Sequence, residues 1–148
     1  MIREATTADF ETLWSIDQQC FVEGISYSQA ELRHYMKRRA AFTLVKEDED
    51  GVAGFVVAES SRRGAGHIIT IDIRPRARRS GYGSELLRAA EQRLRAGGCG
   101  AVLLEVAVDN DDAIRFYKRH GYSVVKTIPR YYLDSLDALL MGKPLETP

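Results

Sequence analysis

Cysteine is scarce in this chain, and there is no excess of charge of either sign. The 148 residues include two cysteines, Cys20 and Cys99, which are too few for a disulfide framework and lack the spacing of metal ligands. We therefore expect two reduced thiols that pack as small hydrophobic side chains, and no bound metal. Lysine plus arginine and aspartate plus glutamate number 21 each, so no global field attracts nucleic acid or a membrane surface. Any anion site must be local.

Long apolar runs are absent as well. The first ten residues, MIREATTADF, are polar and charged and lack the apolar stretch of a secretory signal. The longest apolar runs are far shorter than the roughly 20 residues that span a bilayer. These absences predict a cytoplasmic protein without a membrane partner.

The composition that remains is that of an ordinary soluble protein, with 45% hydrophobic and 28% charged residues. Its length suits one domain, residues 1–148, with a core of its own. Periodicity, caps and turn residues predict these strands (β) and helices (α): β 2–4, α from Thr7 or Asp9 to about Cys20, α from Ser28, β 41–48, β 52–60, β 67–73, α 81–96, β 101–108, α 111–120, β 123–132 and β 138–144. This order predicts an α/β fold, a mixed sheet with helices on both faces.

The strand 101–108, AVLLEVAV, is an almost continuous apolar run, which predicts a strand buried on both faces. Glu105 is its only charged residue. An ionised carboxylate in such a strand is costly unless it is paired or functional. Glu105 is therefore a candidate general base, with a structural ion pair to a neighbouring arginine as the alternative.

Residues 76–87, RARRSGYGSELL, predict a site for an anion. The following helix begins within 81–83, and a helix N-terminus leaves backbone N–H groups unpaired and carries about half a positive charge. Glycines let a ligand approach the backbone closely, and Arg78 and Arg79 add cationic donors. This combination is typical of a diphosphate cradle, with a solvated arginine loop as the alternative.

The segment RRSGYG at 78–83 resembles the Q/R-x-x-G-x-G/A motif of the GCN5-related N-acetyltransferase (GNAT) family, whose loop binds the pyrophosphate of acetyl-coenzyme A. The segment NDDAIRFYKRHGY at 110–122 resembles the N-x-x-A-x-x-x-Y-x-x-x-G-F/Y signature of the same family. The resemblance covers nearly the whole chain and is nearest to the RimI-like, ribosomal-protein-alanine type of protein N-terminal acetyltransferase. It implies the GNAT fold, a mostly antiparallel sheet of about seven strands whose splayed central strands form the acetyl-coenzyme A cleft.

The resemblance also implies which residues bind acetyl-coenzyme A. The strand Ile71-Asp72-Ile73 would pair its backbone with the pantetheine arm. Asn110 matches a position that contacts the cofactor, and it also suits a helix N-cap. The loop and the first helical turn would hold the diphosphate through Arg78, Arg79, Ser80, Gly81, Tyr82, Gly83 and Ser84.

Two catalytic residues follow from the same resemblance. Tyr117 matches the tyrosine that donates a proton to the leaving thiolate, although it shares a helix face with Phe116 and would also fit a core position. Glu105 precedes Tyr117 by twelve residues, the spacing of the corresponding glutamate and tyrosine in ribosomal-protein-alanine enzymes. His67, at the start of a strand, is the alternative base, and Asp72 is a weaker candidate.

Aromatic residues indicate where the acceptor binds. The segment PRYYLD at 129–134 resembles a paired-tyrosine part of the acceptor groove of N-terminal acetyltransferases, so Tyr131 and Tyr132 would contact the first residues of a peptide. Phe21 and Tyr27, between the first two helices, would face them. Ordinary packing at strand ends is the alternative for all four.

The predicted activity is acetyl transfer from acetyl-coenzyme A to a primary amine, the N-terminal α-amine of a protein such as a ribosomal protein. The alternatives are a small-molecule amine or lysine side chain as acceptor, and a non-catalytic module that binds acetyl-coenzyme A. Nucleic-acid binding is not expected, because the net charge is zero and no basic face with interleaved aromatics is present. We expect a monomer, or a homodimer paired through an exposed C-terminal strand.

Overall fold

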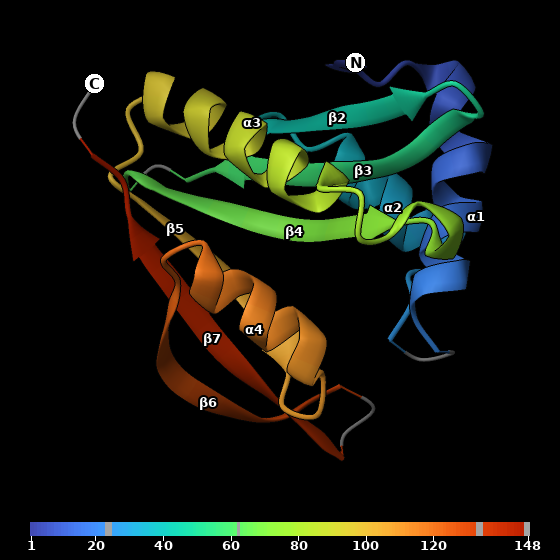
Figure 1. The fold of residues 1–148 in the computed structure, drawn as a ribbon. Coiled ribbons are helices and arrows are strands. Elements are labelled where there is room, and N and C mark those ends of the chain that lie inside the picture. The colour runs from blue at the N-terminus through green and yellow to red at the C-terminus, as the bar shows by residue number, and fades with distance from the viewer. Residues whose placement is uncertain (23–24, 62, 133–134, 147–148) are drawn as a thin grey trace.

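A seven-stranded sheet crosses the protein in the order β1-β2-β3-β4-β5-β7-β6 (Figure 1). The computed structural model describes residues 1–22, 25–61, 63–132 and 135–146. All neighbouring strands are antiparallel except β4 and β5, which run parallel. In chain order the elements, with two short 3-10 turns (η), are β1 Ile2–Glu4, η1 Thr7–Asp9, α1 Phe10–Cys20, α2 Gln29–Met36, β2 Ala41–Asp48, β3 Gly51–Ser60, β4 Ala65–Ile73, η2 Pro75–Ala77, α3 Tyr82–Ala96, β5 Ala101–Ala107, α4 Asp111–Arg119, β6 Ser123–Tyr132 and β7 Leu136–Pro144. The predicted α/β class and element order are confirmed.

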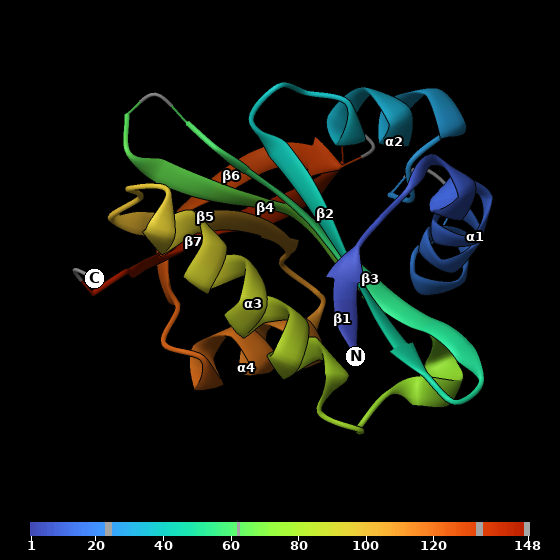
Figure 2. The same cartoon turned by 90° about the horizontal axis from the view of Figure 1, so that it is seen from above.

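The helices cover both faces of the sheet, α1 and α2 on one face and α3 and α4 on the other (Figure 2). Successive residues of a strand point to opposite faces, so β3 directs Phe55 and Val57 towards α1 and α2, and Val56 towards α3. Burying one such side chain stabilises the fold by about 1.5–3 kcal/mol. Within the described ranges, no helix is long and apolar enough to cross a membrane.

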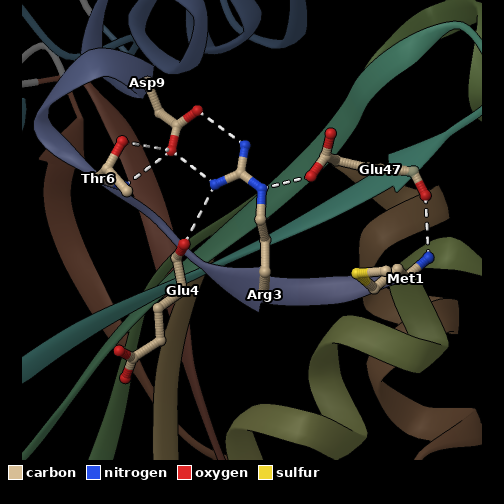
Figure 3. A network of polar contacts seen from close by, with 6 residues as sticks. All are labelled: Met1, Arg3, Glu4, Thr6, Asp9 and Glu47. Atoms are coloured by element: carbon tan, nitrogen blue, oxygen red, sulfur yellow. Dashed lines mark hydrogen bonds and ion pairs between the residues drawn. The ribbon is translucent and has the colours of Figure 1, made fainter.

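A polar network fixes the N-terminal strand (Figure 3). The Arg3 guanidinium donates two hydrogen bonds to Asp9, at 2.8 and 2.9 Å, and another to Glu47 of β2. The hydrogen bonds from Arg3 lower the pKa of the Asp9 carboxyl to about 2. The Met1 amino group donates to the Glu47 carbonyl at 3.0 Å. These contacts join β1 both to β2 and to the start of α1.

The predicted helix starts are mostly correct. Ser28 and Glu31 form the predicted capping box, in which Ser28 Oγ accepts from Glu31 N at 3.1 Å and Glu31 Oε1 accepts from Ser28 N at 2.9 Å. Asp9 is the N-cap residue of α1, but its carboxylate accepts from the Thr6 N–H at 2.7 Å rather than from the helix. Thr7 lies inside η1, so its prediction as a cap is wrong.

Two expectations for the C-terminal half are wrong. β5 is not buried on both faces, since Val102, Leu104 and Val106 are buried while Leu103 and Glu105 are partly exposed. The cause is that α1 and α2 pack chiefly over β2, β3 and β4, which leaves that face of β5 less covered. The last strand, β7, is not an edge strand, because it lies between β5 and β6. The exposed edge near the C-terminus belongs to β6.

Candidate active site

The parallel strands β4 and β5 pair over only three positions, from Ala65–Ala101 to His67–Leu103, and then diverge (Figure 1). On its other side β4 stays paired with β3 as far as Ile73–Gly54. The β4 edge that faces the gap, residues 68–73, therefore has no strand partner in the described part of the chain. A cavity of about 620 Å³ occupies the opening. An extended ligand can pair with such a free edge as an added strand, which suits the role predicted for Ile71-Asp72-Ile73.

A β-bulge shapes this wall of the cavity. Val57 pairs with Thr70 and Ala58 with Ile68, so Ile69 is the extra residue on β4. The Tyr27 hydroxyl donates to the carbonyl of Ile69 at 3.3 Å. Bulges bend a strand and change the direction of its side chains. The hydrogen bond from Tyr27 to the bulge thus attaches Tyr27, which lies between α1 and α2, to the cavity wall.

The start of α3 has the geometry of an anion cradle. Its N-cap residue is Gly81, with φ of 81°, and no side chain caps the helix. The N–H groups of the first turn, Tyr82 to Ser84, are therefore available to a ligand. A Cβ at Gly83 would lie 3.3 Å from Phe116 Cζ, so α4 packs directly against the start of α3. The predicted diphosphate loop and the signature helix α4 are thus brought together.

Polar side chains around the cradle have defined partners. Arg78 lines the cavity, and its Nε donates to the Ile73 carbonyl at 3.2 Å. Ser84 Oγ lies 2.8 Å from His120 Nε2 at the end of α4. Arg79 has a positive φ of 65° and is exposed, as is Ser80. Of the predicted diphosphate residues with long side chains, only Arg78 reaches into the cavity.

Glu105 lies where the two strands separate, and it lines the cavity. His67 Nε2 of β4 is 2.7 Å from Glu105 Oε1 of β5. An ionised carboxylate only accepts hydrogen bonds, so His67 donates from Nε2. Within the described residues Glu105 forms no ion pair with an arginine, and its side-chain partner is His67. The two candidate bases therefore form one hydrogen-bonded pair.

Tyr117 of α4 lines the same cavity and is buried, with 8% of its surface exposed. Burial raises the pKa of the Tyr117 phenol well above its ordinary value, and the nearby Asp72 carboxyl raises it further. The phenol therefore keeps its proton across the neutral range. A protonated hydroxyl at a cavity wall can serve as a proton donor.

Asn110 lines the cavity and is the N-cap residue of α4. Its Oδ1 accepts from the Ala113 N–H at 3.2 Å, which confirms the predicted capping role. The Asn110 side-chain nitrogen is not part of that bond and remains able to donate to a ligand. The contact of Asn110 with a cofactor stays a prediction.

The predicted acceptor residues line this cavity or the one that adjoins it. Phe21, Tyr27 and Tyr132 line it, and the Tyr131 and Tyr132 ring centroids are 4.8 Å apart. Burial, followed by the charge of Glu105, raises the pKa of Tyr131 to about 12. For Tyr132, burial, then Tyr131 and Glu105, raise the pKa above its usual range. These phenols therefore lie within electrostatic reach of the Glu105 carboxylate.

A second cavity, of about 570 Å³, adjoins the first and shares Ile25, Tyr27 and Tyr132 with it. Trp14 and Tyr35, which the sequence analysis missed, also line it. The Tyr35 ring centroid is 5.3 Å from that of Tyr27. Both residues lie in helices whose patterns suggested only packing, so no local signal marked them.

Cys20 and Asp17 were also missed as residues of this region. Cys20 lines the first cavity, and its Sγ donates to the Ile73 carbonyl at 3.3 Å. Burial raises the pKa of this thiol to about 11, so it is not a reactive nucleophile. Asp17 is completely buried on the face of α1 that also carries Leu13. The sequence signal that could have identified Asp17 was a carboxylate on the apolar face of a predicted helix.

Comparisons with known proteins agree with this geometry. The model of the acetyltransferase (GNAT) family matches residues 10–122. The N-alpha-acetyltransferase of Sulfurisphaera tokodaii is 30% identical over 156 aligned positions, which cover 97% of this chain and 92% of the relative. The crystal structure of Ard1 from Thermoplasma volcanium matches with a TM-score of 0.90 and 32% identity, over 99% of this chain and 97% of that one. The ribosomal-protein-S18-alanine N-acetyltransferase of Escherichia coli shares the fold, with a TM-score of 0.88 and 21% identity over 100% of this chain and 95% of that one.

Proposed function

Because the chain belongs to the acetyltransferase (GNAT) family and is an N-acetyltransferase, we propose that it transfers the acetyl group of acetyl-coenzyme A to the α-amine at the N-terminus of a protein. The observation that supports a protein N-terminus as the acceptor is the pair of adjoining cavities, which share Tyr27 and Tyr132. A peptide whose first residue reaches Glu105 needs space for the residues that follow, and the second cavity provides it. Similarity to the N-alpha-acetyltransferase of Sulfurisphaera tokodaii supports the same acceptor.

The residues of this chain fit acetyl-coenzyme A. The uncapped amides of Tyr82, Gly83 and Ser84, with Arg78 beside them, would hold the diphosphate. The free edge of β4 would hold the pantetheine arm by backbone hydrogen bonds, and Asn110 would contact it from α4. Acetyl-coenzyme A supplies the acetyl group as a thioester, whose C–S bond breaks as the new C–N bond forms.

Replacing Arg78 by alanine tests the diphosphate cradle. A hydrogen bond to a charged group contributes about 1.5–3 kcal/mol, so the Kd for coenzyme A should rise by about 10- to 100-fold. Isothermal titration calorimetry measures this change, and Arg39→Ala, at an exposed position in the turn before β2, is the matched control. Equal affinity for coenzyme A in both variants would show that Arg78 does not hold the diphosphate.

The polar groups of the cleft divide the proton transfers between them. Glu105 would take the proton from the attacking amine, while the hydrogen bond from His67 holds its carboxylate in place. Tyr117 would give its proton to the departing sulfur, as its raised pKa permits. One proton leaves the nitrogen and one reaches the sulfur, so the transfers balance.

The α-amine also suits this cleft chemically. An α-amine has a pKa of about 8 and a lysine amine about 10.4, so near pH 7 far more of the α-amine is in the neutral, nucleophilic form. One carboxylate base then has only one proton to remove after attack. A lysine side chain would need a second base or a stronger one.

A set of short peptides tests the acceptor. We expect coenzyme A release with a peptide that has a free α-amine, and none with the same peptide acetylated at its N-terminus but carrying an internal lysine. Preference for the blocked peptide, or for a small amine, would overturn the proposed acceptor. Binding of acetyl-coenzyme A without turnover on any amine would instead indicate the non-catalytic module. Variation of the first residue then tests the ribosomal-protein N-terminus, which stays a prediction.

A further inference from the structure

Two carboxyl groups meet in the interior beneath the cleft, one from α1 and one from β4. Asp17 has 0% and Asp72 has 1% of its surface exposed. Asp17 Oδ2 accepts from the Tyr27 N–H at 2.7 Å, and Asp72 Oδ1 accepts from Thr70 Oγ1 at 2.6 Å. The remaining oxygens, Asp17 Oδ1 and Asp72 Oδ2, accept from no donor in the described residues. Cys20, one turn after Asp17, donates to the carbonyl of Ile73, the residue after Asp72, so both carboxyl groups lie where α1 packs against β4.

A proton shared between the two carboxyl groups accounts for both unpaired oxygens. A buried acceptor without a donor costs free energy, and two adjacent carboxylates removed from water cannot both stay ionised. If one group is protonated, its O–H donates to the other, and each oxygen then has a partner. Burial and then the Asp17 carboxyl raise the pKa of Asp72 well above its ordinary value, in agreement with this state.

The charged and titratable groups around the pair are few. Arg78 is the cation whose charge reaches Asp72, and it favours ionisation. The other groups are weak acids that burial keeps neutral, namely Cys20 on α1, Tyr27 after α1 and Tyr117 on α4. Burial and the neighbouring carboxyl therefore favour the state in which the pair holds one proton.

The pair joins two parts of the cleft that belong to different elements. Asp17 holds the backbone of Tyr27, whose hydroxyl donates to the bulge carbonyl of Ile69. Asp72 lies on β4 between Ile71 and Ile73, at the free edge of the cleft. Tyr27 lines both cavities, so its position determines the shape of the acceptor side.

We propose that Asp17 and Asp72 are positioning residues of the reaction: one proton, shared between their carboxyl groups, fastens Tyr27 and the segment 25–28 to the cleft wall at β4. Loss of that proton places two carboxylates against each other and frees the acceptor side of the cleft. The kinetic part of this inference rests on the proposed function, whereas its structural part does not.

Asparagine substitutions test the shared proton. In Asp17→Asn or Asp72→Asn, the side-chain amide has the shape of the carboxyl group. It donates a hydrogen bond to the remaining carboxylate, and this bond does not depend on pH. A group whose pKa is raised by folding stabilises the protein fully below its unfolded value, near 4, and loses that contribution as the pH rises through the raised value. The folding equilibrium constant of Asp72→Asn, divided by that of the natural chain, should therefore rise about tenfold per pH unit from pH 5 up to the raised pKa of Asp72 and level off above it.

Urea denaturation at several pH values between 5 and 9 measures this ratio. The exposed Glu49→Gln, in the turn between β2 and β3, is the matched loss of one carboxylate, and its ratio should stay constant. A ratio for Asp72→Asn that is as flat as that of Glu49→Gln would overturn the shared proton.

Trp14, the one tryptophan of the chain, reports the positioning directly. Its Nε1 donates to the Tyr27 carbonyl at 3.1 Å, so release of Tyr27 should shift its fluorescence to longer wavelength. Asp72→Leu removes the pair and should produce this shift at pH 7, whereas Asp72→Asn should not. If Asp72→Leu does not fold, Asp17→Ala gives the same comparison.

The kinetic readout separates positioning from general stability. Asp72→Leu should raise the KM for the acceptor peptide at least tenfold with little change in the Kd for coenzyme A, and Asp72→Asn should restore the KM. Equal KM and equal Trp14 emission in both variants would overturn the positioning role. A different outcome would separate the two proposals. If neither the natural chain nor any variant acetylates an amine, but the variants still differ in stability and Trp14 fluorescence as described, the proposed function fails and the shared proton stands.

Discussion

Replacing Glu105 by glutamine is expected to lower kcat/KM for a peptide acceptor by about 10²- to 10⁴-fold, the contribution of a general base. Glutamine keeps the shape of the side chain and can still accept the hydrogen bond from His67, but it cannot take a proton from the amine. The Kd for coenzyme A should not change, because Glu105 is predicted to act on the acceptor. Steady-state rates of the variant and the natural chain at the same pH measure the loss, and an unchanged kcat/KM would contradict the base role.

His67→Gln is the matched comparison for Glu105→Gln. Its side-chain amide can still donate to Glu105, so the carboxylate stays oriented. The value of kcat/KM should then fall by only about tenfold or less, which corresponds to the contribution of a single neutral hydrogen bond. If His67→Gln instead shows the larger loss of kcat/KM and Glu105→Gln the smaller one, His67 is the base and Glu105 its orienting partner. The hydrogen bond between the two side chains suits either assignment.

Replacing Tyr117 by phenylalanine is expected to lower kcat by about 10²- to 10³-fold, as for the loss of a general acid. The substitution removes only the hydroxyl, so the packing of the ring against Phe116 and Tyr122 remains. Burial raises the pKa of Tyr117 above its ordinary value, so the natural chain should keep this proton donor throughout the alkaline range. Steady-state kinetics with saturating acetyl-coenzyme A measures the loss.

Two comparisons make the Tyr117 result specific. An acetyl thioester of a more acidic thiol needs less help to leave, so Tyr117→Phe should slow it far less than acetyl-coenzyme A. Tyr122→Phe also removes a buried hydroxyl, which donates to Glu91 at 2.7 Å in the natural chain. It should cost about 1–3 kcal/mol of stability without lowering kcat. Equal slowing of both thioesters by Tyr117→Phe would remove the acid role.

Much of the fold was predictable because its signals are local. The capping box of Ser28 and Glu31, the asparagine cap at Asn110 and the glycine before α3 each act within one helical turn. The apolar periodicity of α3 gave its length to within one residue. Predictions failed where burial depended on distant elements, as for β5, whose exposed face follows from the placement of α1 and α2.

The sequence by itself determined the order of the elements, and it predicted an anion cradle at 78–84 and the polar groups proposed for the chemistry. Only the tertiary structure decided which of those groups are partners. His67 and Glu105 are 38 positions apart, and they meet because β4 and β5 pair for three residues before they diverge. Asp17 and Asp72 meet because α1 packs across β4, and the second cavity exists because α1, α2 and β6 converge. Local patterns carry no information on such contacts, because the free energy that brings distant segments together comes from burying whole faces of helices and strands.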